Sequence, residues 1–330
     1  MKRFLLLVIL LAALAGGAWL WEDWNFHASG PSQAETGVLI KPGEKVAAIG
    51  RQLQDAGAVS NATLFWIGVR KRGLQASLKA GEYALPAHAS MADIAAILES
   101  GRSIQHKFTA AEGLTSKMIY MLVESDPVLT GDAGPVPTEG SLLPETYLFT
   151  RGTTRAQMLE RMEKAHDSML ENLWRERPPG LPYKTPQEAV ILASIVEKET
   201  AIPDERRHIA GVFVNRLRLG MKLQSDPTII YDVTGGYPLG RGIRESELQR
   251  ASPHNTYVIA GLPPTPICNP GKDALTAVLD PQTTNDLYFV ANGQGGHVFS
   301  ATEAEQSKNV AAWRKIEQSG KQLSATPSRK

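Results

Sequence analysis

The stretch Thr185–Thr200, TPQEAVILASIVEKET, decides how the larger part of this chain is organised. Thr185 supplies an N-cap hydroxyl, Pro186 suits the first helical position, and Glu188 completes a capping box, so a helix begins there. The body of this helix, residues 189–196, is apolar on nearly every face. Such a helix passes through the middle of a domain rather than over its surface. We therefore expect it to form the core of a large α+β domain.

Two acidic residues, Glu197 and Glu199, stand at the end of this apolar helix. At about 100° per residue, their side chains project in nearly opposite directions. Burial and the negative end of the helix dipole both raise the pKa of a carboxyl group placed there. A carboxyl that keeps its proton near neutral pH can act as a general acid toward a glycosidic oxygen. The pattern alone is equally compatible with structural ion pairs, for instance to Arg206, Arg207 or Arg216.

The composition excludes several classes of protein. With 330 residues, of which 42% are hydrophobic and 21% charged, the chain can bury one large core or two modest ones. A net charge of +1 removes the broad electrostatic case for a nucleic-acid partner. The single cysteine, Cys268, cannot form an intramolecular disulfide or a cysteine-rich zinc site. The histidines lack ligand spacing and no Gly-x-Ser-x-Gly elbow occurs, so we expect no metal, no cofactor and no serine hydrolase.

The N-terminal segment is long and apolar enough to cross a membrane. Residues 4–21 carry no charge and number 18, close to the roughly 20 that a spanning helix needs. The basic pair before this run places residues 1–3 in the cytoplasm and the remaining chain outside. We expect a retained transmembrane helix, and the alternative is a signal peptide cleaved among the small residues 12–18. No cysteine follows the run, which excludes a lipoprotein.

Beyond the apolar run, the pattern predicts two folded regions. A linker is expected at 22–36, and a small α+β module at 37–103. In the module we expect a strand at 38–40, helices beginning near Val46, Ala62 and Ser90, and a returning strand at 81–84. This arrangement is similar to LysM-like domains, which bind glycans that contain N-acetylglucosamine, although a spacer domain would fit as well. A larger α+β domain follows at 104–321, and we expect a disordered tail at 322–330.

Polar side chains cluster in two segments downstream of the two glutamates. The segment 223–231, LQSDPTIIY, places several hydrogen-bonding groups before an apolar run, and His254–Tyr257 precedes a loop rich in proline and glycine. Sugar recognition needs paired donors and acceptors for hydroxyls and an apolar platform for the ring. These segments could supply both, but ordinary loops have a similar composition.

Short motifs spread along the chain carry a resemblance to a known family. They are Glu112-Gly113, Leu143–Tyr147, Ala193–Thr200, Val212–Leu217, Leu223–Tyr231, Asn255–Tyr257, Gly261–Pro264, and Tyr288–Gly293 with His297 and Phe299. In this order they closely resemble the YceG-like, or MltG-type, endolytic murein transglycosylases. The resemblance covers nearly all of the chain, including the apolar helix and the LysM-like module.

The resemblance implies cleavage of the β-1,4 bond from N-acetylmuramic acid to N-acetylglucosamine within peptidoglycan strands. The family's essential acid corresponds to Glu199, which would protonate the leaving oxygen. As a carboxylate it would then accept the proton of the C6 hydroxyl, whose attack leaves a 1,6-anhydro end. Ordinary hydrolases require a second carboxylate, for which Asp226 is the nearby candidate. The resemblance makes Asp226 a substrate or scaffold contact instead.

Further assignments follow from the resemblance. The residues expected to contact substrate, each with a rival structural role, are Asn215, Gln224, Asp226, Asn255 and Tyr257. Glu197 is the alternative catalyst. The implied location is the bacterial inner membrane, with the folded domains in the periplasm and penicillin-binding proteins as partners. A hydrolytic muramidase and a non-catalytic peptidoglycan-binding regulator remain alternatives, and the kind of strand end that is produced separates them.

Overall fold

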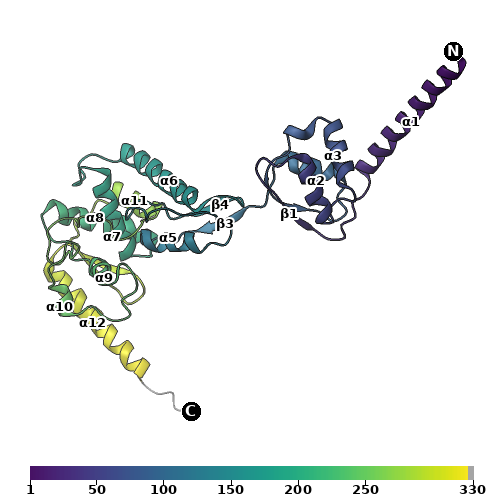
Figure 1. Ribbon diagram of the computed structural model, residues 1–330. Helices are drawn as coiled ribbons and strands as arrows, with labels where there is room; N and C mark the ends of the chain where they lie inside the picture. Colours follow the sequence, from purple (N-terminus) through teal and green to yellow (C-terminus); the bar gives the residue numbers. More distant parts are fainter. Residues whose placement is uncertain (326–330) are drawn as a thin grey trace, which may run out of the picture. The chain divides into compact units, whose positions relative to one another are not determined.

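The computed structural model describes residues 1–325, and these divide into two compact units. We call residues 1–108 with 148–153 the small unit, and residues 109–147 with those from 154 onward the large unit. The expected mixed α+β class with an apolar N-terminal helix is confirmed (Figure 1). In chain order the elements are α1 (Lys2–His27), β1 (Thr36–Ile40), α2 (Val46–Asp55), α3 (Ala62–Lys71), η1 (Leu74–Ala76), β2 (Gly81–Leu85), α4 (Met91–Ser100), β3 (His106–Thr109), α5 (Ser116–Ser125), β4 (Thr146–Phe149), α6 (Arg155–Glu176), α7 (Pro186–Glu199), α8 (Pro203–Arg218), α9 (Asp226–Thr234), α10 (Glu245–Leu248), α11 (Lys272–Leu279), β5 (Tyr288–Ala291), β6 (His297–Ser300) and α12 (Glu303–Ala325).

The small unit is built on one antiparallel pair of strands with helices packed around it. β1 pairs with β2 in a register that joins Thr36 to Leu85 and Ile40 to Gly81. The helices α2 and α3 follow β1 and precede β2, and α4 follows β2. The Asn61 side chain caps α3, and Ser90 opens α4 with a capping box. The expected strands and helices of this module are therefore confirmed.

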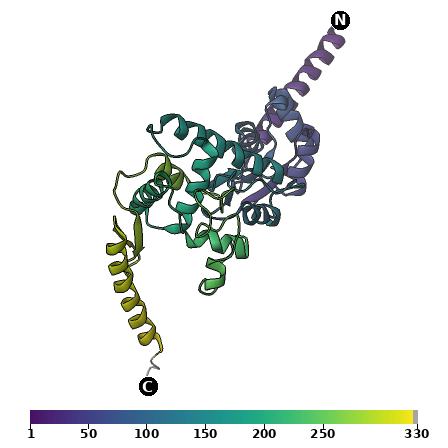
Figure 2. The same cartoon turned by 90° about the vertical axis from the view of Figure 1, so that its left-hand side faces the viewer.

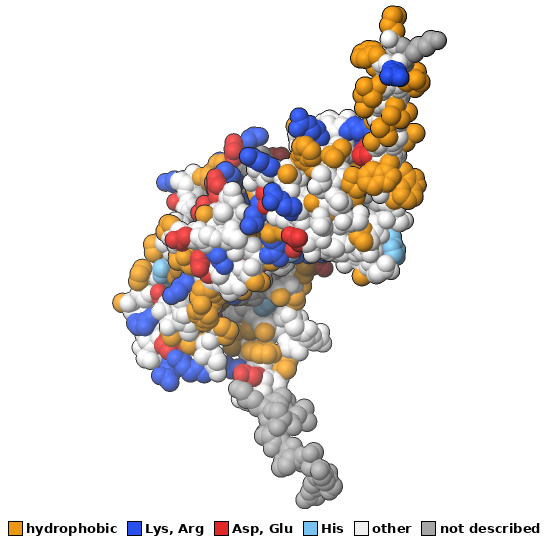
Figure 3. Space-filling view, turned by 45° about the vertical axis from the view of Figure 1, so that its right-hand side comes forward, with side chains coloured by type: hydrophobic (Ala, Val, Ile, Leu, Met, Phe, Trp, Pro, Cys, Tyr) orange, Lys and Arg blue, Asp and Glu red, His pale blue; other side chains and the backbone are white. Residues whose placement is uncertain are grey.

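The helix α1 is longer than the expected span at 4–21. It is the one helix among the described residues that is long and apolar enough to cross a membrane, and its apolar side chains are exposed (Figure 3). It continues through residues 22–27, which the sequence indicated as part of a linker. The reason is packing, because Phe26 is only 2% exposed and belongs to the apolar core of the small unit.

The two units are linked through β3 and β4. These strands form a second two-stranded sheet, and the division between the units falls within both of them. The chain therefore leaves the small unit along β3 and passes through it again after β4 before it enters α6.

The large unit is organised around α7. The predicted start of this helix is confirmed, with Thr185 as N-cap, Pro186 in the first turn and Glu188 in a capping box. Residues 189–196 are all buried, and the helix packs against α6, α8, α9 and α11. A helix with apolar side chains on every face is fully buried only when other elements pack against it on every side. The expected central position of this helix follows directly.

A hairpin and a long helix complete the large unit. β5 and β6 pair antiparallel, with Tyr288 opposite Ser300, and α12 packs on both strands (Figure 2). Helix α12 extends through Ala325, so residues 322–325 of the expected tail are helical. The remainder of that tail, residues 326–330, lies outside the described residues.

Candidate active site

Glu199 is the last residue of α7, and its carboxyl group meets the start of α9. The Ser225 hydroxyl donates a hydrogen bond of 2.5 Å to Glu199 Oε1. Ser225 is the N-cap of α9, yet its side chain makes no capping bond. An N-cap serine usually accepts a bond from the first turn of its own helix. Here the hydroxyl is directed to the carboxyl group instead.

A buried group of hydroxyls fixes the position of Ser225. Ser225 is 1% exposed, and Thr228 and Thr256 are fully buried. The Ser225 amide donates to Thr256 Oγ1 over 2.9 Å, and the Thr228 hydroxyl donates to the Ser225 carbonyl over 2.7 Å. The two threonine hydroxyls are themselves 3.0 Å apart. These bonds hold the Ser225 backbone on both sides, so the serine that donates to Glu199 has a fixed position.

The environment of Glu199 favours its protonated form. Burial is the largest influence and, with the charge of Asp226, raises the pKa of Glu199 to about 7. The Ser225 hydrogen bond and the charge of Arg216 act in the opposite direction and lower this pKa. A carboxyl group with a pKa near 7 carries its proton in a large share of molecules at neutral pH, and it can also release it. Both states are therefore accessible to Glu199.

Arg216, from α8, brings a buried positive charge near Glu199 without forming an ion pair with it. It is 7% exposed, and its guanidinium donates to backbone carbonyls, at 2.6 Å to that of Leu287 and at 2.8 Å to that of Leu223. Its guanidinium lies 5.1 Å from the centroid of the Tyr288 ring. A cation held in this way moderates the pKa of Glu199 but leaves the carboxyl oxygens free for other partners.

Three of the expected substrate residues gather at the same site. The Tyr257 hydroxyl donates a 2.6 Å hydrogen bond to Asp226 Oδ1, and Asp226 follows Ser225 directly. Gln224 Oε1 accepts a 3.3 Å bond from Arg216. Burial and the neighbouring Asp226 raise the pKa of Tyr257, so its phenol remains a hydrogen-bond donor. The Asp226 and Gln224 side chains are exposed to solvent, and the charge of Asp226 acts on Glu199.

The other two expected substrate residues bind the backbone. Asn215 donates to the carbonyls of Thr284 and Asp286, at 2.8 and 3.2 Å. The buried Asn255 donates to three carbonyls, of which the nearest is that of Arg250 at 2.8 Å. The Asn255 side-chain oxygen also accepts a 3.0 Å hydrogen bond from the Tyr257 backbone amide, so it supports the segment that carries Tyr257. Both asparagines hold loops in place here.

Glu197 lies in a different environment, as the helical spacing predicts. Its Oε2 accepts a 3.0 Å hydrogen bond from the Gly271 amide. Burial raises its pKa, and the charge of Glu112 adds to the effect. Gly271 leaves no room for a side chain, because a Cβ there would lie 1.8 Å from Glu112 Oε1. Glu197 therefore takes part in close packing between α7 and the loop before α11.

The ion-pair alternative does not account for either glutamate. Arg206 lies 4.0 Å from Glu112 and 3.2 Å from Asp273. Arg207 forms an ion pair with Asp280 at 2.7 Å, and Arg216 donates to backbone carbonyls such as that of Leu287. Within residues 1–325, neither Glu197 nor Glu199 has a basic nitrogen within 4.0 Å.

Sequence reasoning missed Ser225, Thr228 and Thr256 as the support of Glu199. The pattern Ser225-Asp226-Pro227 is a helix start and could have identified Ser225 as an N-cap. Nothing in it indicates a carboxyl group 26 residues earlier in the chain. Among the described residues, no group of three or more histidines, cysteines and acids is placed to hold a metal ion.

Comparison with known proteins finds relatives that are named endolytic murein transglycosylases. It is 28% identical over 357 residues to an endolytic murein transglycosylase of Streptococcus pneumoniae serotype 2, covering 92% of this chain and 64% of that protein. It is 36% identical over 173 residues to an endolytic murein transglycosylase of Bacillus subtilis, covering 52% of this chain and 47% of that protein. The chain thus spans less than two thirds of the length of either relative.

A crystal structure of a YceG-like protein has a similar fold. A YceG-like protein from Listeria monocytogenes matches with a TM-score of 0.52 and 28% identity, over 84% of this chain and 99% of that one. The model of the YceG-like family matches residues 38–312, which include α7, α9 and every residue of the site around Glu199. The chain therefore belongs to the YceG-like family.

Proposed function

We propose that this protein is a lytic transglycosylase that cleaves within peptidoglycan glycan strands, with Glu199 as its general acid and base. The observation that carries the proposal is the environment of Glu199, a carboxyl group at the end of a buried helix with a pKa raised to about 7. The names of the pneumococcal and Bacillus relatives support the same class of reaction.

In this mechanism a single carboxyl group serves twice. Glu199 first protonates the oxygen that joins N-acetylmuramic acid to N-acetylglucosamine, and positive charge develops at the muramic anomeric carbon. The resulting carboxylate then removes the proton of the C6 hydroxyl of the same sugar. That oxygen attacks the anomeric carbon and closes a 1,6-anhydro ring, so Glu199 ends protonated again. A pKa near 7 suits both steps, because the group must give a proton and take one at the same pH.

The residues around Glu199 take supporting roles. Ser225 orients the carboxyl group, and its hydroxyl stabilises the carboxylate that forms after the first proton transfer. Asp226 and Gln224 are exposed and offer acceptors and a donor to sugar hydroxyls. Asp226 is bonded to the Tyr257 hydroxyl, which supports a substrate or scaffold role rather than that of a second catalytic carboxylate.

Digestion of purified glycan strands tests this proposal. The detergent-solubilised full chain is incubated with strands freed of their peptides, and mass spectrometry identifies the new ends. We expect 1,6-anhydromuramic ends from the natural chain, none from Glu199→Gln, and continued cleavage by Glu197→Gln, provided that Glu197→Gln remains folded by circular dichroism. Reducing muramic ends would indicate a muramidase, and the absence of any cleavage would indicate a binding protein. Full cleavage by Glu199→Gln would overturn the assignment.

The surroundings of the enzyme are also part of the proposal. The apolar helix α1 would anchor the chain in the bacterial inner membrane, with both folded units in the periplasm. The β1–α2–α3–β2 order of the small unit is compatible with a LysM-like module that binds glycan. Penicillin-binding proteins, which polymerise the strands, are the partners that the family resemblance suggests.

A further inference from the structure

The end of α1 is inserted into the small unit. Phe26 packs into the core, and its ring lies against Gly68 of α3. A Cβ at Gly68 would lie 2.1 Å from the Phe26 ring, so only glycine permits this approach. The contact is five residues beyond Trp21, where the apolar run ends. The helix therefore passes from exposed apolar surface to protein core within little more than one turn.

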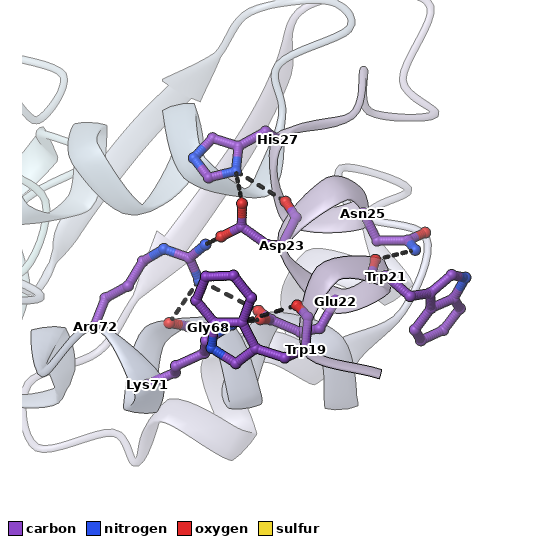
Figure 4. A network of polar contacts seen from close by, with 9 residues as sticks. All are labelled: Trp19, Trp21, Glu22, Asp23, Asn25, His27, Gly68, Lys71 and Arg72. Carbon is purple, nitrogen blue, oxygen red and sulfur yellow. Dashed lines mark hydrogen bonds and ion pairs between the residues drawn. The ribbon is translucent and has the colours of Figure 1, made fainter. Parts of the chain in front are cut away.

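Charged side chains fasten the same junction from both helices (Figure 4). Glu22 is 6% exposed and lies 2.6 Å from Lys71 and 3.2 Å from Arg72. Arg72 also pairs with Asp23, and its guanidinium lies 3.9 Å from the centroid of the Phe26 ring. Removing one partner of such a buried pair would leave its counterpart uncompensated, which is strongly unfavourable. The junction is a built contact and not a flexible tether.

The length of the junction limits how far the small unit can lie from the membrane. Five residues of helix, from Trp21 to Phe26, span about 7.5 Å. The polar headgroup layer on each side of a bilayer is roughly 5–7 Å thick. If Trp21 marks the end of the apolar span, the core of the small unit begins at the outer edge of this layer.

We propose that the small unit rests on the membrane surface, with the C-terminal end of α3 in the phospholipid headgroup layer. This inference depends on the proposed anchoring by α1. Lys71 lies 3.8 Å from the centroid of the Trp19 ring, whereas Gly68 contacts Phe26, so α3 turns its C-terminal end toward the membrane. Trp19 lies beside this end of α3, and the rings of Trp19, Trp21 and Trp24, all on the same part of α1, are exposed. Tryptophan is the residue that favours the interface between lipid and water, and a lysine close to it can reach lipid phosphate.

The continuous helix α1 would keep the small unit at a short, fixed distance from the bilayer. Because α1 is continuous into its core, this unit cannot extend away from the membrane as a domain on a linker would. Any ligand that it binds is then held close to the membrane surface.

The test compares two single labels, one near each end of α3, in vesicles. A fluorescent maleimide is attached at Arg70→Cys or, as the matched control, at Ser60→Cys; both positions are exposed and outside the ion-pair network, while Cys268 is buried. The labels lie ten residues apart along a segment that is mostly helical, which separates them by about 15 Å. The full chain is reconstituted in vesicles of phosphatidylethanolamine and phosphatidylglycerol at 3:1 that carry a quencher on the lipid headgroup.

We expect at least twofold stronger quenching of the label at position 70 than at position 60. Equal quenching at both positions in protein that floats with the vesicles would overturn the inference and leave the anchoring intact. Failure of the protein to float with the vesicles would overturn the anchoring and the inference together.

Two further variants test the junction itself. Gly68→Ala should reduce the difference in quenching, because the added Cβ displaces Phe26, whereas Gly37→Ala, which has open space around its Cβ, should preserve it. A flexible Gly-Ser insertion after Trp21 leaves the contacts of Glu22, Asp23 and Phe26 with α3 in place and is not expected to unfold the small unit. It releases only the contact between Lys71 and Trp19. It should abolish the difference, and persistence of the difference in this variant would contradict the inference.

Discussion

Replacing Glu199 with glutamine should stabilise the large unit at alkaline pH while it abolishes cleavage. In the folded chain the pKa of Glu199 is raised from its ordinary value of 4.5 to about 7. Below pH 4.5 the carboxyl is protonated in both folded and unfolded chains and has no effect. Between pH 4.5 and 7 the unfolded chain releases this proton and the folded chain retains it, so the free energy of unfolding falls as the pH rises. The loss is complete above pH 7.

The magnitude follows from the same two pKa values. At about 1.4 kcal/mol per pKa unit, the rise from 4.5 to about 7 corresponds to about 3 kcal/mol. Glutamine does not ionise, and its carbonyl oxygen can still accept the Ser225 hydrogen bond. At pH 8 the Glu199→Gln variant should therefore be more stable than the natural chain by up to about 3 kcal/mol, and at pH 4 the two should be equal.

Amide hydrogen exchange of residues 189–196 in the detergent-solubilised full chain measures this difference. These buried amides of α7 report the unfolding of the large unit, once intrinsic exchange rates are corrected for pH. Glu176→Gln, at an exposed position of α6, is the control and should change protection little at either pH. Equal protection of Glu199→Gln and the natural chain at pH 8 would refute the reasoning, because it would mean that Glu199 ionises at no cost.

Three other substitutions test the site. Ser225→Ala removes the hydrogen bond that lowers the pKa of Glu199, so the alkaline limb of kcat/KM should move to higher pH while kcat falls. Asp226→Asn removes a negative charge that raises the same pKa, so this limb should move to lower pH; parallel movement in both variants would contradict the electrostatic account. Gly271→Ala places a Cβ within 1.8 Å of Glu112 Oε1 and should lower the free energy of unfolding by about 1–3 kcal/mol, as measured by urea denaturation. An unchanged urea midpoint would refute this close packing.

The parts of the fold that local chemistry determines were predictable from the sequence. The capping box at Thr185 and the apolar residues that follow it determine both the start and the burial of α7. The spacing of Glu197 and Glu199 determines that they meet different surroundings. These features depend on residues only a few positions apart, so hydrophobic periodicity and capping rules predict them.

Features that depend on distant segments were not predictable in this way. The partner of Glu199 is Ser225, and its position depends on Thr256, a further 31 residues along the chain. Glu22 marks the end of an apolar run in the sequence, yet its partners Lys71 and Arg72 lie about 50 residues away and carry the helix onward into the core. Pairing over such separations is a property of the tertiary fold.

Residue type alone also leaves the role of an amide undecided. Asn215 and Asn255 occur in segments that resemble the family motifs, and a substrate contact is a reasonable expectation for each. In the structure both donate to backbone carbonyls of neighbouring loops. An asparagine that recognises a sugar and one that holds a loop present the same donors and acceptor, so only the fold distinguishes them.

A direct titration of Glu199 tests the central claim. Glutamate labelled with ¹³C at the side-chain carboxyl is incorporated into the full chain, and the resonance of Glu199 is assigned by its absence from Glu199→Gln. The account predicts that this resonance titrates with a midpoint near pH 7. A midpoint near 4.5, the ordinary value for glutamate, would mean that the group is ionised at neutral pH and cannot be the proton donor that the mechanism requires.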